Sequence, residues 1–350
     1  MANSIPLTLV VPICNSADYL RPFFQHLDAQ KFKNFQCLFV YDRSEDQTLP
    51  ILQKLLSDKH AFSSQLLLKE VREGVGKARD FAIDSGLITT DYVLFLDCDD
   101  DFSDDFLDQM VSRAVSTGAD ITFCGYNRVE GKDHHIISKE MIHNPEEITD
   151  LLHCSILSYL NTAPWNKLLK TNIIGDSRFI HKGAGEDAMF FFKIYPNCSK
   201  FAFINDTLYD YNVNQDSVAD KTDESYLEEA KQGYLEVKDF YDHHGDVYKS
   251  WMPFLESVVF LKVGIGQTTR VCLNKRHHYH SIIKQSRSYL YNNFPNWKRN
   301  PFLSFSSCAK HGLKTLMVWR CKMLYRLNWF GLFVFDYKLF THLFRKDIKW

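Results

Sequence analysis

The amino-acid sequence predicts an α/β fold in which a mostly parallel sheet is covered by helices on both faces. In the first part of the chain, short apolar runs alternate with segments whose apolar residues recur at helical spacing. The 350 residues are 45% hydrophobic and 24% charged, which is typical of a globular protein and excludes a disordered one. No run of about 18 uncharged apolar residues occurs, which argues against an ordinary transmembrane helix.

Five short apolar runs predict the strands of this sheet. Each is bounded by polar or turn-forming residues, as expected for strands buried in a sheet. The predicted strands are Leu7–Ile13, Phe35–Tyr41, Gln65–Leu68, Tyr92–Leu96 and Ile121–Tyr126. Because ligands of parallel sheets bind outside the carboxyl ends of the strands, we expect functional residues just after Ile13, Tyr41 and Leu96.

Helical segments lie between these strands and continue beyond them. The predicted connecting helices are Ala17–Gln30, Asp46–Ser57, Gly76–Ser85 and Asp104–Ser116. From Glu224 onward the helical patterns become longer, and Gly and Pro become rarer. We therefore expect a catalytic domain over residues 1–222 and a helical region over residues 223–350.

The charge of the chain is distributed unevenly. Residues 262–350 contain 17 Lys and Arg but only two acidic residues, whereas the other 261 residues contain 24 basic and 41 acidic ones. Such an asymmetry indicates an anionic partner for the basic part. The nine Cys residues form no CxxC pair and no secretory signal is apparent, so we expect reduced cytosolic thiols rather than disulfides or a zinc site.

An acidic run follows the fourth predicted strand. Residues 97–101 hold four carboxylates in five positions, which repel one another unless a cation neutralises them. The D-x-D spacing places Asp97 and Asp99 on the same side of an extended segment. Such oxygen ligands suit Mg²⁺ or Mn²⁺, which can also bind a diphosphate. The alternative is a solvated acidic turn with Asp104 as the cap of the next helix, and Asp100 and Asp101 fit a turn or capping role better than a ligand role.

Seven segments together resemble the family 2 inverting glycosyltransferases of the GT-A fold, of the bacterial surface-polysaccharide type. They cover roughly residues 5–220 and occur in the order that the family shows. The segments are Val10–Asn15 (VVPICN), Phe39–Asp46 (FVYDRSED), Gly74–Asp80 (GVGKARD), Leu94–Asp100 (LFLDCDD), Pro164–Leu168 (PWNKL), Gly185–Asp187 (GED) and Leu208–Tyr211 (LYDY) with Ser217.

The chain departs from the family pattern at four positions. Cys14 replaces a Tyr, Tyr41 replaces the first Asp of a D-D-G-S loop, Arg43 replaces its Gly, and Asp80 replaces an Asn. The changes at Cys14 and in the loop affect the nucleobase pocket that the family would have. The motifs for the metal and for the catalytic base are intact.

The resemblance implies a nucleotide-sugar site at the ends of the first two strands. Asp42 is expected to contact the uracil or its ribose, since a carboxylate accepts strongly from N–H or hydroxyl groups. Pro12, Cys14 and Asn15 are expected to line the same pocket. The alternative is that Asp42 is an ordinary turn residue and that the other three only end their strand.

The resemblance also implies residues that bind the phosphates and the metal. Glycines such as Gly74 let backbone N–H groups approach a phosphate at a helix N-terminus, where Lys77 and Arg79 would add positive charge. Arg72 could also reach the nucleotide. Asp97 is expected to contact the ribose, and Asp99 to ligate Mn²⁺ or Mg²⁺ between the phosphates. The alternative for Lys77 and Arg79 is a solvated basic helix face.

Two adjacent acids are the candidates for the catalytic base. An inverting transfer needs one carboxylate to take the proton of the acceptor hydroxyl. The resemblance assigns this role to Asp187, with Glu186 as its neighbour or substitute. Acids are also favoured at helix N-termini, so a purely structural acidic pair is the alternative. Trp165 could stack on a sugar or fill the core, and Asn166 and Lys167 could contact the donor or acceptor.

The segment Leu313–Phe344 mixes aromatic with basic residues, which are Lys314, Arg320, Lys322, Arg326 and Lys338. Such a helix can lie at an anionic membrane surface. Alternatively, its aromatic stripe packs on the catalytic core, or its basic residues hold an anionic polysaccharide. We expect no nucleic-acid partner, because no nucleic-acid motif accompanies the charge.

These features predict a metal-dependent inverting glycosyltransferase that moves a hexose or N-acetylhexosamine from a UDP-sugar to a glycan or lipid-linked acceptor. The expected pathway is the synthesis of capsule, lipopolysaccharide or another surface polymer, at the inner face of the cell membrane. One alternative is a sugar nucleotidyltransferase, although no G-x-G-T-R-like loop follows the first strand. The other is a membrane-docked sugar-nucleotide-binding subunit without turnover, which Cys14 and Tyr41 favour.

Overall fold

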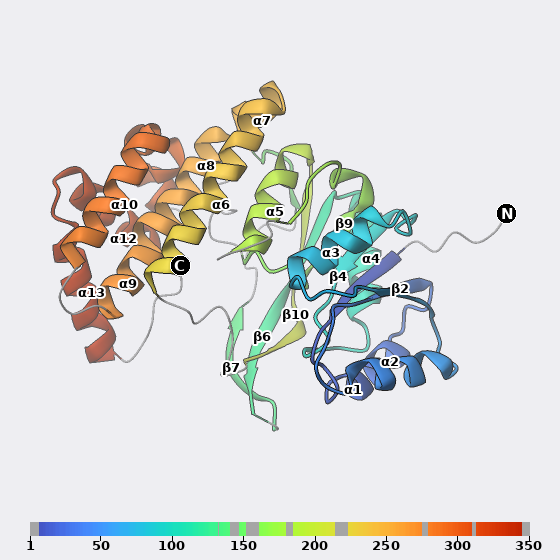
Figure 1. The fold of residues 1–350 in the computed structure, drawn as a ribbon. Helices are drawn as coiled ribbons and strands as arrows, with labels where there is room; N and C mark the ends of the chain where they lie inside the picture. Colours follow the sequence, from blue (N-terminus) through green and yellow to red (C-terminus); the bar gives the residue numbers. More distant parts are fainter. Residues whose placement is uncertain are drawn as a thin grey trace. The chain divides into compact units, whose positions relative to one another are not determined.

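The computed structural model describes residues 7–131, 133–140, 147–151, 161–179, 185–213, 223–274, 279–309 and 313–344. The chain forms two compact units (Figure 1). The first comprises residues 1–151, 162–181 and 186–217, and the second comprises residues 152–161, 182–185 and 218–350. The predicted domain boundary near residue 222 lies outside the described residues and stays a prediction.

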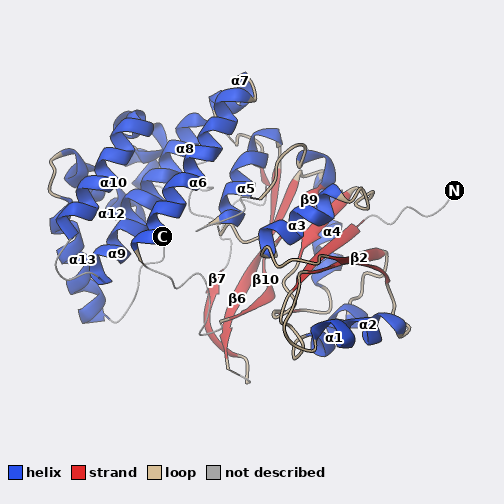
Figure 2. Ribbon diagram, in the orientation of Figure 1, coloured by secondary structure: helices blue, strands red, loops and turns tan. Residues whose placement is uncertain are grey.

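The first unit is built on one large mixed sheet, drawn in red in Figure 2. Its strand order is β3-β2-β1-β4-β9-β6-β10-β5, with β7 paired to β6 and β8 paired to β10. The strands are β1 Leu7–Ile13, β2 Phe35–Tyr41, β3 Ser63–Leu68, β4 Tyr92–Phe95, β5 Asp101–Phe102, β6 Ile121–Glu130, β7 His135–Glu140, β8 Glu147–Ile148, β9 Lys167–Lys170 and β10 Phe201–Asn212.

The parallel half of the sheet places three strand ends together. β1 pairs in parallel with β2 and with β4, so that Ile13 lies opposite Tyr41 and Val10 opposite Phe95. The backbone N–H of Leu96 donates to the carbonyl of Val10. The carboxyl ends of β1, β2 and β4 therefore meet at one edge, as the sequence predicts.

Helices cover both faces of this sheet, which confirms the predicted fold class. Alternate residues of β1 pack with the apolar stripes of three helices on one face. On the other face, Phe95 meets the rings of Phe179 and Phe190 edge-on. The helices of this unit are α1 Leu20–Ala29, α2 Thr48–Ser57, α3 Val75–Asp84, α4 Phe106–Thr117 and α5 Glu186–Ile194.

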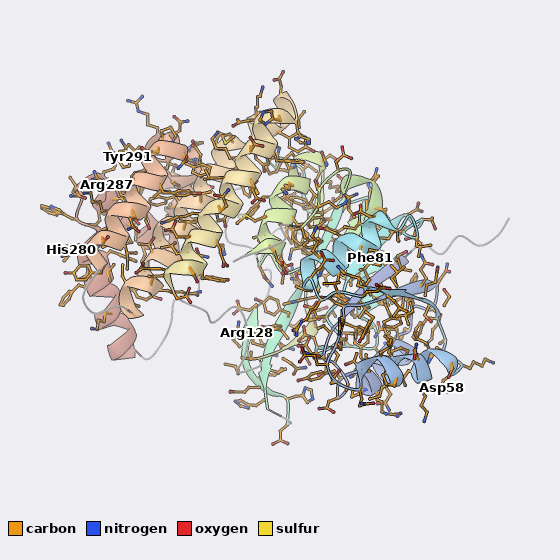
Figure 3. The ribbon with its side chains drawn as sticks, in the orientation of Figure 1. Asp58, Phe81, Arg128, His280, Arg287 and Tyr291 are labelled. Atoms are coloured by element: carbon orange, nitrogen blue, oxygen red, sulfur yellow. The ribbon has the colours of Figure 1, made fainter. Side chains whose placement is uncertain are left out.

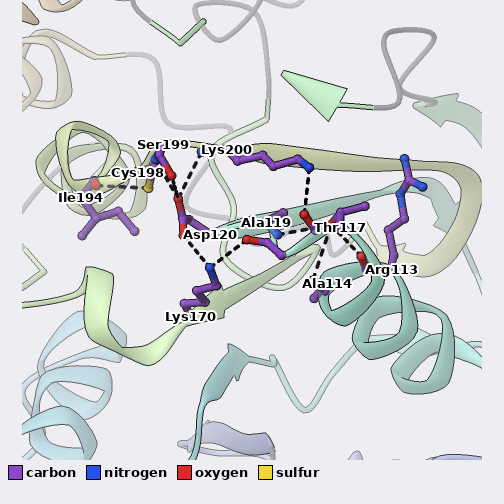
Figure 4. Close-up of polar contacts among 11 residues, drawn as sticks. Arg113, Ala114, Thr117, Ala119, Asp120, Lys170, Ile194, Cys198, Ser199 and Lys200 are labelled. Atoms are coloured by element: carbon purple, nitrogen blue, oxygen red, sulfur yellow. Dashed lines mark hydrogen bonds and ion pairs between the residues drawn. The ribbon is translucent and has the colours of Figure 1, made fainter. Parts of the chain in front are cut away.

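A buried carboxylate joins three strands at the opposite edge of the sheet (Figure 4). Asp120, just before β6, accepts hydrogen bonds from Lys170 Nζ at the end of β9 (2.9 Å) and from the backbone N–H groups of Ser199 (2.7 Å) and Lys200 (3.1 Å) before β10. Burial disfavours its charge, but these hydrogen bonds outweigh burial and lower the pKa of Asp120. This junction aligns the central strands.

The second unit is helical in its described residues, as expected for the region after Glu224. Its α-helices are α6 Glu224–His243, α7 Asp246–Ser250, α8 Met252–Val259, α9 Thr268–Asn274, α10 Tyr279–Asn293, α11 Phe305–Ala309, α12 Leu313–Arg326 and α13 Phe330–Phe344. A π-helix, Phe260–Gln267, joins α8 to α9. No helix among the described residues has both the length and the apolarity needed to cross a membrane.

Part of the basic, aromatic C-terminal sequence is buried in the interior of this unit. Tyr325 and Tyr337 are buried, and so is Lys322, whose Nζ donates to the carbonyl of Leu303 at 2.9 Å. Along α10 the guanidinium of Arg287 lies over the ring of Tyr291, 5.0 Å from its centroid; both are labelled in Figure 3. The aromatic stripe is therefore partly core, and Lys322 does not lie on a solvated basic face.

Candidate active site

The loops that follow β1 and β2 interlock at the site edge. Asn15 adopts a left-handed backbone conformation, with φ at 50°, and its N–H donates to Ser44 Oγ at 2.9 Å. Its Oδ1 accepts from the backbone N–H of Glu45, also at 2.9 Å. The N–H of Ser44 in turn donates to the hydroxyl of Tyr41, which stands at a position where the family has Asp. Asn15 thus positions this loop as well as ending β1.

Asp42 is 2% exposed and holds a third loop against the first two. Its carboxylate accepts the backbone N–H of Glu73 at 3.1 and 3.2 Å and that of Gly74 at 2.8 Å. Gly74 has φ at 98°, in the region that favours glycine. Asp42 therefore orients the turn that begins α3, which is more than the ordinary turn role, and its contact with a nucleoside stays a prediction.

Arg79 on α3 connects two of the predicted acids. Its Nη2 lies 2.8 Å from Asp97 Oδ1 and its Nη1 lies 2.6 Å from Asp187 Oδ1. The guanidinium is 2% exposed and lies over the ring of Phe179, 5.3 Å from its centroid. Burial disfavours its charge, but Asp187, Asp97 and the nearby Glu186 outweigh burial and raise its pKa. A solvated basic face is thus excluded for Arg79, whereas Lys77 is half-buried and Arg72 exposed.

Asp80, next to Arg79 in the sequence, contacts a different part of the chain. Its Oδ1 accepts the backbone N–H of Phe179 at 2.9 Å. Burial raises the pKa of Asp80 to about 6. Asp80 therefore fastens α3 to the segment that precedes α5.

Glu186 and Asp187 open α5 and face the start of α3. A Cβ added at Gly76 would lie 2.8 Å from Glu186 Oε2, so only glycine allows this approach. Burial, together with the charge of Asp187, raises the pKa of Glu186 to about 7. Burial also raises the pKa of Asp187, although Arg79 opposes this. Both acids therefore hold protons more tightly than exposed carboxylates do.

The acidic run after β4 is divided among separate partners. Asp100 is 3% exposed and accepts from the hydroxyl of Tyr209 and the backbone N–H of Asn212, each at 2.8 Å. Asp101 begins β5 and lies 2.9 Å from His26 Nε2. Asp101 thus lies in a strand and not in a turn, whereas Asp100 directly follows the turn at residues 98–99. That neither acid ligates a metal stays a prediction. The side chain of Asp105, the residue that precedes α4, makes no capping hydrogen bond.

The two acids predicted to ligate a metal, Asp97 and Asp99, are both partly buried. Among the described residues, no group of three or more His, Cys, Asp or Glu side chains could by itself hold a metal ion. Magnesium commonly binds through one or two carboxylates together with substrate phosphates. The donor set thus fits a cation shared with a diphosphate and does not fit a closed protein cage.

The P-W-N-K-L segment fills the interior beside this site. Trp165 stacks on Tyr209 with ring centroids 4.5 Å apart, and Asn166 donates to the carbonyl of Cys124. Lys167 is fully buried and donates to Asn166 Oδ1 at 2.7 Å. Burial lowers the pKa of Lys167 to about 7, although Cys124 and Asp187 oppose this. Of the two roles considered for Trp165, the structure shows core packing.

Comparison with known proteins decides the family. The sequence profile of Glycosyl transferase family 2 matches residues 8–186. The chain belongs to this family. The family consists of glycosyltransferases, and membership in it argues against a sugar nucleotidyltransferase.

Within this family, the chain resembles bacterial polysaccharide glycosyltransferases. Glycosyltransferase GlyA of Streptococcus pneumoniae is 26% identical over 222 residues, 61% of this chain and 31% of GlyA. Poly(ribitol-phosphate) beta-N-acetylglucosaminyltransferase TarS of Staphylococcus aureus is 24% identical over 240 residues, 67% of this chain and 38% of TarS. The match thus spans about a third of the length of these two relatives.

Solved structures show the same fold. The crystal structure of S. aureus TarS 1-349 in complex with UDP-GlcNAc has a TM-score of 0.68 at 19% identity, covering 92% of both chains. The mannosyltransferase PcManGT of Pyrobaculum calidifontis, in complex with GDP-Man and Mn²⁺, has a TM-score of 0.53 at 12% identity, covering 98% of this chain and 88% of that one. The GT-A fold that the resemblance implied is confirmed.

Several residues of the site were not identified from the sequence. Tyr209, Asn212, His26 and Gly76 were not singled out for these contacts. Their partners lie between 75 and 113 residues away in the sequence. No local pattern signals such contacts, because they depend on the order of strands in the sheet.

Proposed function

We propose that this glycosyltransferase moves a sugar, with inversion, from a UDP-sugar to a hydroxyl group of a glycan or lipid-linked acceptor. The observation that carries the proposal is the buried guanidinium of Arg79, which joins Asp97 at the end of β4 to Asp187 at the start of α5. The acid predicted to contact the nucleotide and the acid predicted to act as base are thereby held at one edge of the sheet. Fixed geometry of this kind is what a single in-line displacement requires.

In this proposal the donor nucleotide lies against the interlocked loops. Asp42 and Asn15, with Pro12 and Cys14, form the wall for the uridine, and Asp97 accepts from the ribose. Gly74, Lys77 and Arg72 lie at the start of α3, where a helix N-terminus and positive charge favour phosphate. Arg79 acts on this site through Asp97 and Asp187, since both of its Nη atoms are already paired with them.

Asp99, with Asp97 beside it, would hold a Mn²⁺ or Mg²⁺ ion together with the diphosphate. Such a cation supplies Lewis-acid stabilisation of the negative charge on the departing nucleoside diphosphate. The solved neighbours that contain GDP-Man with Mn²⁺ and UDP with Mn²⁺ support this choice of ions. Asp100 and Asp101 take no part in this proposal, because Tyr209 and the backbone N–H of Asn212 donate to Asp100, and His26 and the Asn212 side chain contact Asp101.

Asp187 is proposed as the base that takes the proton of the acceptor hydroxyl. Burial raises the pKa of Asp187, and the positive charge of Arg79 counteracts this effect and thus favours the charged carboxylate. Glu186 lies beside it with a raised pKa and is the substitute candidate. Exchange of each acid for its amide separates the two, because the amide keeps the shape of the side chain but cannot accept a proton.

A nucleotide-sugar screen with Mn²⁺ tests the donor, the metal and the activity together. Release of UDP is measured for UDP-glucose, UDP-galactose, UDP-N-acetylglucosamine and UDP-N-acetylgalactosamine, with and without acceptor glycans. We expect turnover with one of them, loss of transfer in Asp187→Asn, and UDP binding retained in that variant. Full transfer by Asp187→Asn would contradict its role. Binding of the sugar nucleotide without turnover across all acceptors would support the binding-subunit alternative.

The relatives support a pathway of surface-polymer synthesis. The names of two relatives refer to poly(ribitol-phosphate) and to amylovoran biosynthesis. The TarS structure that contains UDP-GlcNAc makes an N-acetylhexosamine donor the first to be tested. We extend both the pathway and this donor to the present chain as part of the proposal.

We further propose that the second unit binds the inner face of the cell membrane. Large apolar side chains are exposed in α11–α13 and the turns between them; these are Phe305, Trp319, Leu327, Trp329, Leu332 and Phe335. Arg320, Arg326 and Lys338 are exposed on the same helices. Exposed aromatic residues together with basic ones favour an anionic bilayer interface.

Vesicle flotation tests this surface. The chain is expected to bind vesicles that contain phosphatidylglycerol, and the double variant Trp329→Ser and Phe335→Ser to bind them at least about tenfold more weakly. Val247→Ser is the matched control, since Val247 is equally exposed in the same unit, on α7. Equal binding to neutral and anionic vesicles, or equal binding by the double variant, would refute membrane docking by this surface.

A further inference from the structure

A polar pocket lies beside the acidic run, at one edge of the first unit's sheet. Its volume is about 320 Å³, at the small end of ligand pockets in proteins. Residues of α1, β5, β6 and β10 and of the adjoining loops form its wall. They are His26, Asp101, Phe102, Ser103, Asn127, His134, Thr207, Leu208 and Asp210.

The wall of this pocket is held in place by its own hydrogen bonds. Asp101 lies between two imidazoles, 2.9 Å from His26 Nε2 and 3.3 Å from His134 Nδ1. Across the pocket, Asn127 Nδ2 donates to Asp210 Oδ1 at 2.6 Å. A pocket whose polar groups are fixed before binding loses little entropy when a ligand enters.

One buried acceptor of the pocket has no donor among the residues that the structure describes. Asn127 lines the pocket and is 9% exposed, and no described residue donates to its Oδ1. A buried polar atom left in this state costs free energy, and a ligand hydroxyl would remove that cost. Asn127 precedes Arg128, labelled in Figure 3, on β6.

The chemistry of the wall selects the class of ligand. The described residues of the wall include no Lys or Arg, and the two imidazoles there already face Asp101, so an anion would meet the carboxylates of Asp101 and Asp210. The described residues form no cluster able to hold a metal ion here. Carboxylate, amide and hydroxyl groups beside Phe102 and Leu208 match a neutral compound with many hydroxyl groups.

The pocket is linked to the proposed donor site through one side chain. Asn212 Nδ2 donates to the backbone carbonyl of Asp99 at 2.8 Å and to Asp101 Oδ2 at 3.1 Å. A ligand in the pocket would therefore lie next to the segment that holds the donor diphosphate. This position suits a unit of the acceptor and not the nucleotide.

We propose that this pocket binds a neutral polyhydroxylated unit of the acceptor, either a sugar or an alditol. The proposal rests on the proposed function, because it names the acceptor of that reaction. In it, Asp210 and Asn127 accept hydrogen bonds from the ligand hydroxyls, and Phe102 and Leu208 contact its apolar C–H groups. The reacting hydroxyl belongs to the part of the acceptor that extends toward Asp187.

Saturation-transfer NMR on the full chain tests this pocket directly. The probes are methyl β-D-glucopyranoside, methyl N-acetyl-β-D-glucosaminide, methyl β-D-galactopyranoside and ribitol, each with and without UDP and Mn²⁺; inorganic phosphate is the anionic probe. We expect at least one of the four neutral probes to bind and phosphate not to compete with it. Binding of none of the four, or displacement by phosphate, would overturn the proposal.

Two variants and one control assign the signal to the pocket. Asp210→Asn keeps the shape of the wall and is expected to weaken binding about tenfold, as for the loss of one hydrogen bond to a charged group. Thr207→Trp fills the cavity and is expected to abolish binding, whereas Asp108→Asn, at an exposed position of α4, is expected to leave it unchanged. Unchanged binding in both pocket variants would refute the assignment.

UDP affinity, measured by calorimetry on the same proteins, separates this proposal from the proposed function. Both pocket variants are expected to retain the UDP affinity of the unmodified chain. If the unmodified chain bound a neutral probe but not UDP, the proposed donor site would be refuted and the proposed acceptor pocket would be supported. If the unmodified chain bound UDP but none of the neutral probes, the proposed acceptor pocket would be refuted and the proposed donor site would be supported.

Discussion

At the scale of single residues, the site depends on the positive charge of the Arg79 side chain, which surrounding carboxylates neutralise. Arg79 is buried, and its two Nη atoms are paired with carboxylates of two different elements. A buried charge is tolerated only when it is paired and hydrogen-bonded. Arginine is suited to this position because its planar fork can serve two partners at once, whereas lysine presents a point charge.

Arg79→Lys is the sharpest test of this bridge. The variant keeps the charge but cannot reach both Asp97 and Asp187 in the same geometry, so we expect transfer to fall about 100-fold and the free energy of unfolding to fall by about 3 kcal/mol. UDP release and thermal unfolding are the measurements. Arg178→Lys is the control, since Arg178 is half-buried and pairs with one exposed carboxylate, that of Asp84. Equal activity of Arg79→Lys and the control would contradict the bridging role.

Glu186 should make the reaction sensitive to pH. Its pKa is raised to about 7, so it gains a proton as the pH falls through that value. We expect kcat, measured by UDP release at saturating donor, to decrease below about pH 7 and to be level above it. Glu186→Gln should lose this step and keep part of the activity, whereas Asp187→Asn should be inactive at every pH. An unchanged pH profile in Glu186→Gln would show that another group titrates.

Individual site residues were predictable only where a local motif contained them. Asp97, Asp99, Arg79 and Asp187 were found from short segments that resemble the family. The partners of Asp100 and Asp101 were missed because Tyr209, Asn212 and His26 come from distant elements. The excess negative charge after β4 is relieved by these side chains and by Arg79, and a divalent cation is not needed to explain Asp100 or Asp101.

At the scale of elements, the junction at Asp120 holds β6, β9 and β10 in register. Asp120→Ala removes a buried carboxylate that accepts hydrogen bonds from Lys170, Ser199 and Lys200. We expect the free energy of unfolding, measured with urea, to fall by about 2–4 kcal/mol. Asp108→Ala on the exposed side of α4 is the control and should change stability by less than about 0.5 kcal/mol.

The effect of Asp120 should also depend on pH in a defined direction. Its pKa is lower in the folded chain than the ordinary value of about 3.9, so the stabilisation is complete above that value and is lost as the pH falls through the folded pKa. The stability difference between the unmodified chain and Asp120→Ala should therefore narrow below about pH 4. A constant difference down to pH 2 would contradict a charged Asp120.

The predicted elements agree best with the structure where one strand is buried on both faces. β1 and β2 have the predicted bounds because their continuous apolar runs leave no other interpretation. β9 was missed because it has four residues, two of them lysine, and β10 because its middle is polar and bulged. Antiparallel insertions of this kind depend on pairing with neighbours more than on their own sequence.

At the scale of the whole molecule, donor binding should stabilise the chain. A ligand that binds only the folded state adds about 2.7 kcal/mol at a concentration one hundred times its dissociation constant. We expect UDP with Mn²⁺ to raise the melting temperature more than UDP alone, and Asp99→Asn to abolish the added effect of Mn²⁺. Asp108→Asn should behave like the unmodified chain. If Mn²⁺ raised the melting temperature of Asp99→Asn as much as that of the unmodified chain, Asp99 would not be a metal ligand.

The sequence by itself determined the fold class, the strands of the parallel half, the family and the acids at the strand ends. These features are local. A buried strand requires a run of apolar residues, and a functional motif requires particular residues at short spacing, so both can be recognised from consecutive residues. Only the tertiary structure decided that Arg79 bridges two acids, that Asp100 and Asp101 bond to β10 and α1, and that a polar pocket lies beside them. Such contacts join residues far apart in the chain, and they exist only once the order of strands in the sheet is established.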